Sequence, residues 1–372
     1  MEKDFCAAVF LGGAGFAVSR MVGRPLTIGE ISDLGLDYIA SGMCDNCAPA
    51  RDFGNAAGEL KFMKRITTFI LMLSLGVTMG FADAPKRPRI LGISHMAVFV
   101  SDLDKAREFY EDFLGYAEPF NLKRDDGSVR IAFVKINEDQ YIELFTDKPT
   151  HEGQLSHIAF YTDSAEGMRA FLAARGVKTP ESVPKGKIGN LNFNVSDPDG
   201  HTVEIVQYEP DGWTRQAAGK FLPEARVSTH MTHVGVDIGA LAPATKFYGD
   251  NFGLSEFWRG SSSGTVLSWV NMRVPDGEDY LEFMLYGAPP TAKDLGVKNH
   301  ICLVTPDVEK AVAMLKARPA AKNYTLPFEI KVGVNGKRQA NFYDPDGTRV
   351  ELMEPNTFDG KVRPPSTAPP PR

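Results

Sequence analysis

Four short segments decide the architecture of this chain: Ser94-His95-Met96-Ala97-Val98, Ser156-His157-Ile158-Ala159-Phe160, Thr232-His233-Val234-Gly235-Val236 and Asn299-His300-Ile301-Cys302-Leu303. Each begins with a polar residue and a histidine and continues as an apolar run that is typical of a buried strand. Self-similarity at a regular interval indicates a repeated structural unit. We therefore interpret this region as four copies of one module.

A second set of strand-like segments carries one glutamate at the centre of each. In all four modules this glutamate follows the histidine by 47 to 51 residues, which chance does not readily produce. The four segments are Tyr141-Ile142-Glu143-Leu144-Phe145, Thr202-Val203-Glu204-Ile205-Val206, Tyr280-Leu281-Glu282-Phe283-Met284 and Arg349-Val350-Glu351-Leu352-Met353.

A helical pattern separates each histidine strand from its glutamate strand, over residues 103–114, 165–174, 242–252 and 308–317. Two further strands fit before each glutamate strand, which gives a βαβββ module and an α+β fold. Asp-Pro-Asp-Gly at 197–200 and 344–347 marks tight turns. Modules pair into domains at 90–210 and 228–356, with a linker at 211–227 and a disordered Pro-rich tail at 357–372.

Composition limits the classes of partner. The chain has 372 residues, 43% of them hydrophobic and 24% charged, which is typical of a soluble globular protein with two compact units. Its formal charge of −6 and its scattered basic residues give no electrostatic footprint for nucleic acid or an anionic membrane. We expect a small-molecule substrate instead.

A targeting segment lies inside the sequence. Met63-Lys64-Arg65, an apolar run over 66–81 and Ala82-Asp83-Ala84 follow the order of a secretory signal peptide at 63–84. The run is shorter than the ~20 residues of a membrane anchor, the alternative interpretation. We expect Met63 to be the true start, residues 1–62 to be a non-native extension, and the mature protein to be periplasmic or secreted with no stable membrane span.

The cysteines give no evidence for a disulfide in the mature chain. Cys6, Cys44 and Cys47 precede Met63, which leaves Cys302 without an internal partner. The isolated C-x-x-C pair is weak evidence for a metal or redox site.

The recurring histidines and glutamates predict metal binding. Glu143 shares its strand face with Tyr141 and Phe145, while Ile142 and Leu144 occupy the other face, so the carboxylate has no polar surface to reach. A buried carboxylate needs a partner, and a divalent cation is one. For any single residue an ordinary neighbour would suffice, as we expect for His151, His201 and His230. Four histidines and four glutamates that recur in step along the chain favour metal binding over ordinary neighbours.

At this point the sequence resembles a known family, the glyoxalase I branch of the vicinal oxygen chelate superfamily, closest to bacterial glyoxalase I. The resemblance covers nearly all of the chain after residue 90. It rests on the four histidine and four glutamate segments, Asp102, Arg107, Phe109-Tyr110, Leu114-Gly115, Phe247-Tyr248, Phe252-Gly253-Leu254 and the two Asp-Pro-Asp-Gly turns. It implies paired modules that form cupped mixed sheets around a metal.

In that family two histidines and two glutamates hold a divalent ion that polarises neighbouring substrate oxygens, while a glutamate moves a proton. Here the resemblance implies Ni, Zn, Fe or Mn and, as proton shuttles, Glu204 and Glu351. Sites would form within halves or across them, with His95 and Glu143 joined to His300 and Glu351. The predicted ligands are His95, Glu143, His157, Glu204, His233, Glu282, His300 and Glu351.

Departures from the family concern its glutathione contacts. The family has an arginine four residues after the first histidine and an asparagine four after the first glutamate. Phe99 and Asp147 stand there in the first half, and Asp237 and Tyr286 in the second. We therefore expect the metal chemistry to be retained and the glutathione specificity to be lost.

Two alternatives remain open at this level. An extradiol-type ring-cleaving dioxygenase would need a catalytic histidine shortly before the last turn, and residues 328–343 contain none. A non-catalytic small-molecule or antibiotic-binding protein of the superfamily generally lacks the metal ligands. The protein would be a monomer with two domains or a homodimer. Candidate aromatic pocket walls are Phe133, Phe193, Trp258, Trp269 and Phe342.

Overall fold

The structure, a computed structural model, describes residues 85–149, 152–288 and 290–371, and residues Ala82–Arg372 form one compact unit. The expected extension at 1–62 and signal peptide at 63–84 lie outside the described residues, together with three of the cysteines and His151. In the part of the chain that is described, no helix is both long and apolar enough to span a bilayer.

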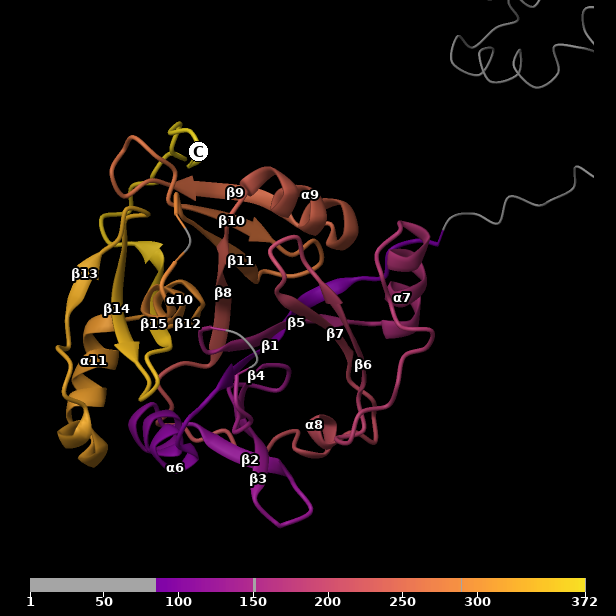
Figure 1. Cartoon of the computed structure of the whole chain (residues 1–372). Coiled ribbons are helices and arrows are strands. Elements are labelled where there is room, and N and C mark those ends of the chain that lie inside the picture. Colours follow the sequence, from indigo (N-terminus) through magenta and orange to yellow (C-terminus); the bar gives the residue numbers. More distant parts are fainter. Residues whose placement is uncertain (1–84, 150–151, 289, 372) are drawn as a thin grey trace, which may run out of the picture. The chain divides into compact units, whose positions relative to one another are not determined.

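The first two modules form one seven-stranded mixed sheet in the order β2-β3-β4-β1-β5-β7-β6 (Figure 1). β1 pairs with β4 in parallel and with β5 antiparallel, so the two modules join edge to edge along their histidine strands. The strands are β1 (Ile90–Phe99), β2 (Ala117–Lys123), β3 (Val129–Lys135), β4 (Tyr141–Phe145), β5 (Leu155–Thr162), β6 (Leu191–Ser196) and β7 (Thr202–Gln207).

The third and fourth modules repeat this arrangement in an eight-stranded sheet, in the order β13-β14-β15-β12-β8-β11-β10-β9. β8 pairs with β11 in parallel and with β12 antiparallel. The strands are β8 (His230–Ile238), β9 (Ser255–Gly260), β10 (Trp269–Arg273), β11 (Tyr280–Leu285), β12 (His300–Val304), β13 (Ile330–Val332), β14 (Lys337–Tyr343) and β15 (Arg349–Thr357).

All four predicted helices are present. α6 (Leu103–Arg107) continues into the π-helix η1 (Glu108–Phe113), and α7 (Ala165–Ala174), α9 (Leu241–Phe252) and α11 (Val308–Lys316) follow in the other modules. Side chains of Asp102, Ser164 and Asp307 cap three N-termini. Shorter helices are α8 (Trp213–Gln216), α10 (Ala292–Lys298) and the 3₁₀ turn η2 (Pro319–Asn323).

The second module departs from the predicted βαβββ pattern. Between α7 and β6 the described chain makes only an isolated bridge, Lys185 with Leu191, in place of a third strand. Pro180 and Pro184 lie in this segment, and proline cannot donate to a strand ladder. The α+β class and the two curled mixed sheets are as predicted.

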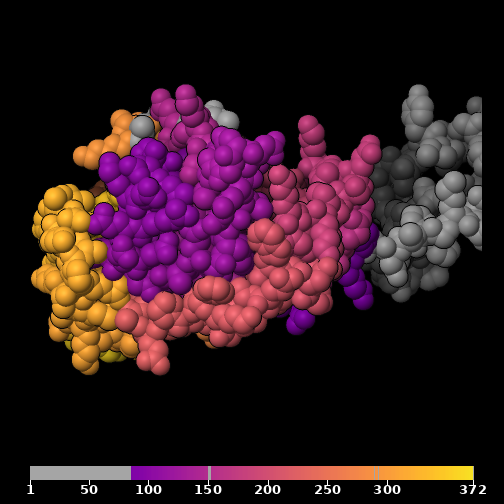
Figure 2. All heavy atoms as spheres, turned by 90° about the horizontal axis from the view of Figure 1, so that it is seen from below, coloured from indigo at the N-terminus to yellow at the C-terminus, as the bar shows by residue number. Residues whose placement is uncertain are grey.

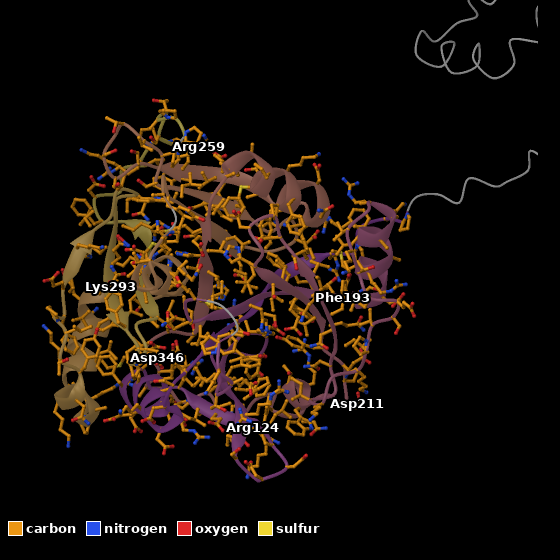
Figure 3. All side chains as sticks on the ribbon, viewed as in Figure 1. Arg124, Phe193, Asp211, Arg259, Lys293 and Asp346 are labelled. Carbon is orange, nitrogen blue, oxygen red and sulfur yellow. The ribbon has the colours of Figure 1, made fainter. Side chains whose placement is uncertain are left out.

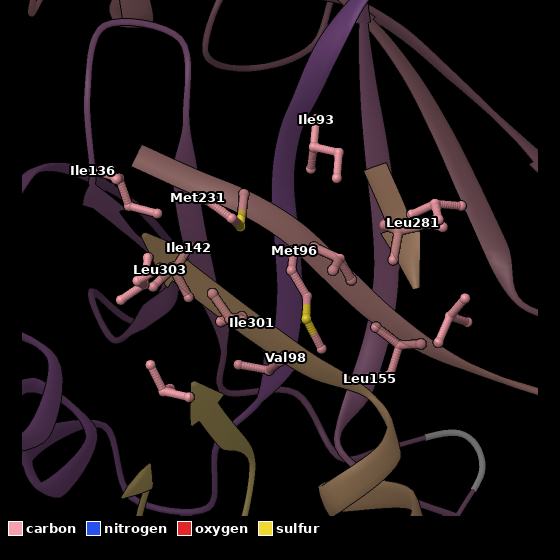
Figure 4. Close-up of a cluster of buried hydrophobic side chains, with 14 of the residues drawn as sticks. Ile93, Met96, Val98, Ile136, Ile142, Leu155, Met231, Leu281, Ile301 and Leu303 are labelled. Carbon is pink, nitrogen blue, oxygen red and sulfur yellow. The ribbon is translucent and has the colours of Figure 1, made fainter. Parts of the chain in front are cut away.

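Apolar faces of both sheets share one hydrophobic core. In the first sheet Met96 stands beside Ile142 and Ile158, in register with Val203. These residues belong to the same buried cluster as Met231, Leu281, Ile301 and Leu303 of the second sheet, as Figure 4 shows. The four helices contribute to this cluster too. Each sheet therefore turns its alternate face, which carries the histidines and glutamates, away from the core.

The two Asp-Pro-Asp-Gly turns tie the halves together reciprocally. In each turn the first aspartate accepts backbone N–H groups through Oδ1, as Asp197 does from Asp199 at 3.0 Å and Asp344 does from Asp346 at 3.0 Å. The Oδ2 atom accepts a tyrosine hydroxyl from the other half. Tyr248 of α9 donates to Asp197 at 2.9 Å, and Tyr110 of η1 donates to Asp344 at 3.0 Å.

The linker packs on the first module. Lys135 is fully buried and its Nζ donates to the carbonyls of Ala217 at 2.6 Å and Lys220 at 3.0 Å. Val227 N–H donates to the carbonyl of Leu114 at 2.9 Å. Figure 2 shows this segment, in salmon pink, lying against the violet first module.

Residues 358–371 also differ from the expected disordered tail, because backbone hydrogen bonds hold them on the second sheet. Ser366 N–H donates to the carbonyl of Arg259 on β9 at 2.9 Å, and Leu267 N–H donates to the carbonyl of Pro369 at 2.8 Å. β9 is the edge strand of its sheet, so the tail supplies partners for backbone groups that an edge leaves open.

Candidate metal centres

The four predicted ligands of the first half converge on one face of the first sheet. Ala97 of β1 stands between Glu143 of β4 and His157 of β5. Glu204 of β7 pairs with Ala159 of β5, which in turn pairs with His95 of β1. Paired residues share a face and alternate residues return to it. His95, two residues before Ala97, therefore points to the same side as the other three.

Distances within this group are short. His95 Nε2 lies 3.0 Å from His157 Nε2 and 2.9 Å from Glu204 Oε2, and His157 Nε2 lies 3.0 Å from the same oxygen. Glu143 is looser, with Oε1 3.5 Å from His95 Nε2 and Oε2 3.9 Å from His157 Nε2. Both imidazoles thus turn Nε2 toward one point shared with two carboxylates.

Polar neighbours hold these side chains from behind. Ser94 Oγ lies 3.0 Å from His95 Nδ1 and 2.6 Å from the hydroxyl of Tyr208, and Ser156 Oγ lies 3.1 Å from His157 Nδ1. Asn192 Nδ2 donates to the outer oxygen of Glu204. Such partners fix the ring orientation and leave Nε2 free for a ligand.

The second half repeats the geometry more loosely. His233 Nε2 lies 3.1 Å from His300 Nε2. Glu282 Oε2 lies 3.5 Å from His300 Nε2 and 3.9 Å from His233 Nε2, and Glu351 Oε2 lies 3.6 Å from His300 Nε2. All four ligands predicted for this half therefore meet as they do in the first.

Supporting contacts differ in detail between the halves. His300 Nδ1 lies 2.7 Å from the carbonyl of Lys298, while the His233 ring packs on Tyr280 with centroids 4.5 Å apart. Buried His233 Nδ1 has no hydrogen-bond partner among the described residues. Gln339 Nε2 donates to Glu351, as Asn192 does to its glutamate in the first half.

Small residues make room for each group, a signal that the sequence analysis overlooked. Two residues after each histidine the chain has Ala97, Ala159, Gly235 or Cys302, and these four stand between the ligands in the sheet register. At Gly235 a Cβ atom would meet the His300 ring. Cys302 is fully buried and lies close to His233 and Glu351.

Electrostatics differ between the two groups. In the first, burial raises the pKa of Glu143 above its ordinary value, against the opposing charge of His95. Burial would also raise the pKa of Glu204, but hydrogen bonds with both imidazoles lower it overall. The pKa of His95 is lowered by burial and raised more strongly by the two carboxylates.

In the second group burial dominates. Burial, and then the positive charge of Arg349, lowers the pKa values of His233 and His300 well below the ordinary range. Burial and repulsion from Glu351 raise the pKa of Glu282 to about 8. Both imidazoles are therefore neutral at pH 7, which is the form that binds a metal.

The donor set and its spacing fit a divalent ion. Ligand atoms that bind one ion at ~2.1 Å lie roughly 3 Å apart when adjacent, close to the shorter separations in the first group. Two imidazole nitrogens and two carboxylates suit Ni, Zn, Fe or Mn. Each half closes on itself, so the alternative that joins His95 and Glu143 with His300 and Glu351 is not the arrangement in this structure.

A cavity opens above the first group. A separate cavity lies beside the second group; none of that group's four ligands lines it, but Asn271 and Tyr280, the strand neighbours of Glu282 and His233, do. The first, of about 430 Å³, is lined by both histidines, both glutamates and an apolar wall that includes Phe133, Phe145 and Ile188. The second, of about 870 Å³, includes Phe257, Trp258 and Tyr280. Among the predicted pocket walls Phe133 and Trp258 are correctly placed, and Trp269 packs beside Trp258 with ring centroids 6.5 Å apart.

Two of the aromatic predictions are wrong. Phe193 and Phe342 belong to the hydrophobic core rather than to a cavity above the ligands. Asn192 and Asn194 flank Phe193 on β6. Because side chains alternate between the two faces of a strand, the two asparagines lie on the ligand face and Phe193 lies on the core face.

Two of the three histidines outside the pattern, His201 and His230, have ordinary partners, as predicted, and His151 lies outside the described residues. His201 lies 3.0 Å from Asp197 and 3.1 Å from Asp237, and His230 lies 2.8 Å from Asp279.

Comparison with known proteins agrees with this geometry. Residues 92–205 and 230–352 each match the Glyoxalase/Bleomycin resistance protein/Dioxygenase superfamily. The chain belongs to this superfamily. The two matches coincide with the two sheets and include all eight ligand candidates.

Two relatives that this chain matches in sequence are named as lactoylglutathione lyases. Lactoylglutathione lyase of Schizosaccharomyces pombe is 20% identical over 70% of this chain and 96% of its own length. A probable lactoylglutathione lyase of Synechocystis is 33% identical over 30% of this chain and 92% of its own length.

Among solved structures, the 2,3-dioxygenase LapB of Pseudomonas has a TM-score of 0.54 at 17% identity, over 72% of this chain and 93% of that one. Homoprotocatechuate 2,3-dioxygenase of Brevibacterium fuscum has the same TM-score at 19% identity, over 78% of this chain and 77% of that one. At such identities the likeness establishes the fold alone.

Proposed function

We propose that this chain is a metal-dependent lyase or isomerase of the glyoxalase I type that acts on a small carbonyl compound. The observation that carries the proposal is the convergence of two imidazole Nε2 atoms and two carboxylates in each half, which in the first half line a cavity. A divalent ion held by the four residues of each group would supply a Lewis acid that polarises two neighbouring substrate oxygens.

The second glutamate of each group is the proposed proton shuttle. An amide side chain fixes one oxygen of Glu204 and of Glu351, while Oε2 faces the imidazoles. A carboxylate oriented in this way can take a proton from carbon next to a carbonyl and return it to the neighbouring carbon.

Internal contacts support a substrate other than a glutathione adduct. At the four positions where the family contacts glutathione, Asp147 pairs with Arg124 at 2.7 Å and Asp237 pairs with His201 at 3.1 Å. Lys298 Nζ lies 5.5 Å from the ring centroid of Tyr286, and the rings of Phe99 and Phe145 have centroids 6.1 Å apart. These side chains are engaged within the fold.

Metal-catalysed proton transfer can be measured without knowledge of the natural substrate. Elemental analysis should give about two metal ions per chain, and exchange of the carbon-bound protons of hydroxyacetone should be followed in D₂O by NMR. We expect Glu204→Gln combined with Glu351→Gln to slow the exchange about 100-fold or more, since general base catalysis contributes 10²–10⁴-fold. Glu166→Gln, on the exposed face of α7 and paired with Arg169, is the control.

Two outcomes would contradict the proposal. Protein that binds no metal would support a non-catalytic binding protein. Oxygen uptake with catechol, together with no proton exchange, would support a ring-cleaving dioxygenase. In each half a second carboxylate, Glu204 or Glu351, lies near the histidines in addition to Glu143 or Glu282, and this favours the lyase, because a dioxygenase needs open positions on its iron for both oxygen and catechol.

Export remains part of the proposal. The segment at 63–84 carries the order of a signal peptide, and N-terminal sequencing of the protein recovered from the periplasm or medium would identify the cleavage point. A start within residues 1–62 of the recovered protein would contradict it.

Since each group forms within one half, a monomer suffices for both centres, and a homodimer is not required.

A further inference from the structure

The cavity beside the second group is lined by more basic than acidic side chains. Arg273, Lys337 and Arg363 line it, and Glu278 is the one acidic side chain among its lining residues. Arg349 adds a buried positive charge beside Glu351, with a separation of 3.9 Å. Arg363 is paired with Asp359 at 2.8 Å. Arg273 and Lys337 are therefore the basic side chains of this cavity that remain to bind a ligand.

Arg273 and Lys337 have no acidic partner among the described residues. Register places Arg273 opposite Tyr280, on the ligand face of the sheet, where its guanidinium lies over the Phe257 ring at 4.4 Å. Lys337 is half-buried, and burial lowers the pKa of its ammonium. Glu351 acts on Lys337 through its charge but forms no ion pair with it. Two neighbouring cations without a paired carboxylate form a site that favours an anion.

An unsatisfied polar group lies in the same cavity. Asn271 is 5% exposed and lines the cavity opposite Glu282, yet its side-chain oxygen has no hydrogen-bond donor among the described residues. Buried polar atoms are normally paired, so an orphaned acceptor on a cavity wall indicates a ligand with a hydroxyl or N–H group.

The first cavity lacks this charge at every matching position. Lys135 on β3 corresponds to Arg273, but its ammonium group donates hydrogen bonds to Glu138 and to two carbonyls of the linker. Asn190 corresponds to Lys337 and donates to Thr214 at 2.9 Å. Thr202 corresponds to Arg349. The halves are therefore built alike around their ligand groups and differ in the walls of their cavities.

We propose that the second cavity binds a carboxylate anion, held by Arg273 and Lys337. A hydroxyl next to the carboxylate would supply the donor that Asn271 lacks, and a ring would pack on Trp258 and Phe257. The inference rests on the proposed function only in treating the second cavity as a substrate site.

Mandelate and its neutral amide, mandelamide, separate charge from shape. We expect the full-length protein to bind mandelate at least about tenfold more tightly in calorimetric titration, because a hydrogen bond to a charged group contributes ~1.5–3 kcal/mol. Arg273→Gln with Lys337→Gln should abolish that preference, whereas Arg273→Lys should retain it. Arg259→Gln is the matched control, since Arg259 pairs with Glu256 on neighbouring β9 and is labelled in Figure 3.

Equal binding of the two compounds, or a mandelate preference that survives the double variant, would overturn the inference. Thermal denaturation of each variant shows whether it is folded, and exposed Arg273 has no structural partner beyond Phe257. Elemental analysis of the same samples keeps the two proposals apart. A metal-loaded protein that does not prefer mandelate refutes this inference alone, and a mandelate-selective protein without metal refutes the proposed function alone.

Discussion

Replacing His201 by threonine should remove a pH-dependent contribution to stability. His201 bridges the halves, with Nδ1 3.0 Å from Asp197 and Nε2 3.1 Å from Asp237, and its side chain is 14% exposed. Threonine is the natural substitute, because Thr348 occupies the matching position of the other Asp-Pro-Asp-Gly turn.

The sign and size follow from the pKa of His201. Burial alone would lower it, but the two carboxylates raise it to about 10, above the ~6.5 of an unfolded histidine. A raised folded-state pKa gives stabilisation that is complete below pH ~6.5 and is lost as the pH rises through about 10. At ~1.4 kcal/mol per pH unit, wild type should lose roughly 3 kcal/mol relative to the variant between pH 6.5 and 9.5.

Urea denaturation of both proteins at pH 6.5, 8.0 and 9.5 measures this loss. His230→Gln is a comparison of the same sign and smaller size, because the ion pair with Asp279 raises the pKa of His230 and the side chain of His230 is more exposed. A difference between wild type and His201→Thr that stays constant over the three pH values would refute the reasoning, since the imidazole would then not titrate in that window.

Three further predictions concern single contacts. Asn192→Leu should weaken metal binding at the first centre about 10- to 100-fold in a chelator competition, and unchanged affinity would mean that Glu204 needs no amide partner. Gly235→Ala should displace His300 and reduce metal content to about one ion per chain, whereas two ions would show that the ring can move aside. Tyr248→Phe should lower the free energy of unfolding, measured by urea denaturation, by ~1 kcal/mol. An unchanged free energy would mean that the hydrogen bond from Tyr248 to Asp197 does not stabilise the fold.

Much of the fold and of the ligand groups could be predicted from spacing. The histidine-to-glutamate interval specified two strands with a helix between them, and alternation placed His95 and Glu143 on the face opposite Met96. Which modules share a centre could not be predicted, because either partner of β1 presents the same residues. The antiparallel pairing of β1 with β5 decides it through contacts distant in sequence.

Other features depend on side-chain detail that sequence does not determine. Phe193 and Phe342 have strand positions that suit a cavity wall, but only the register with Glu204 and Glu351 shows that they face the core. The tail is rich in proline, and its order comes from backbone bonds to β9. The excess of basic side chains in the second cavity appears only when residues from β10 and β14 are seen to meet.

Because both sheets bury their apolar faces in one shared core, each ligand group lies on the face of its sheet that points away from this core. If both centres are active as proposed, a compound released at one would have to diffuse through bulk solvent before it reached the other. The two halves would then be able to work on different metabolites at the same time, without direct transfer of a product between them.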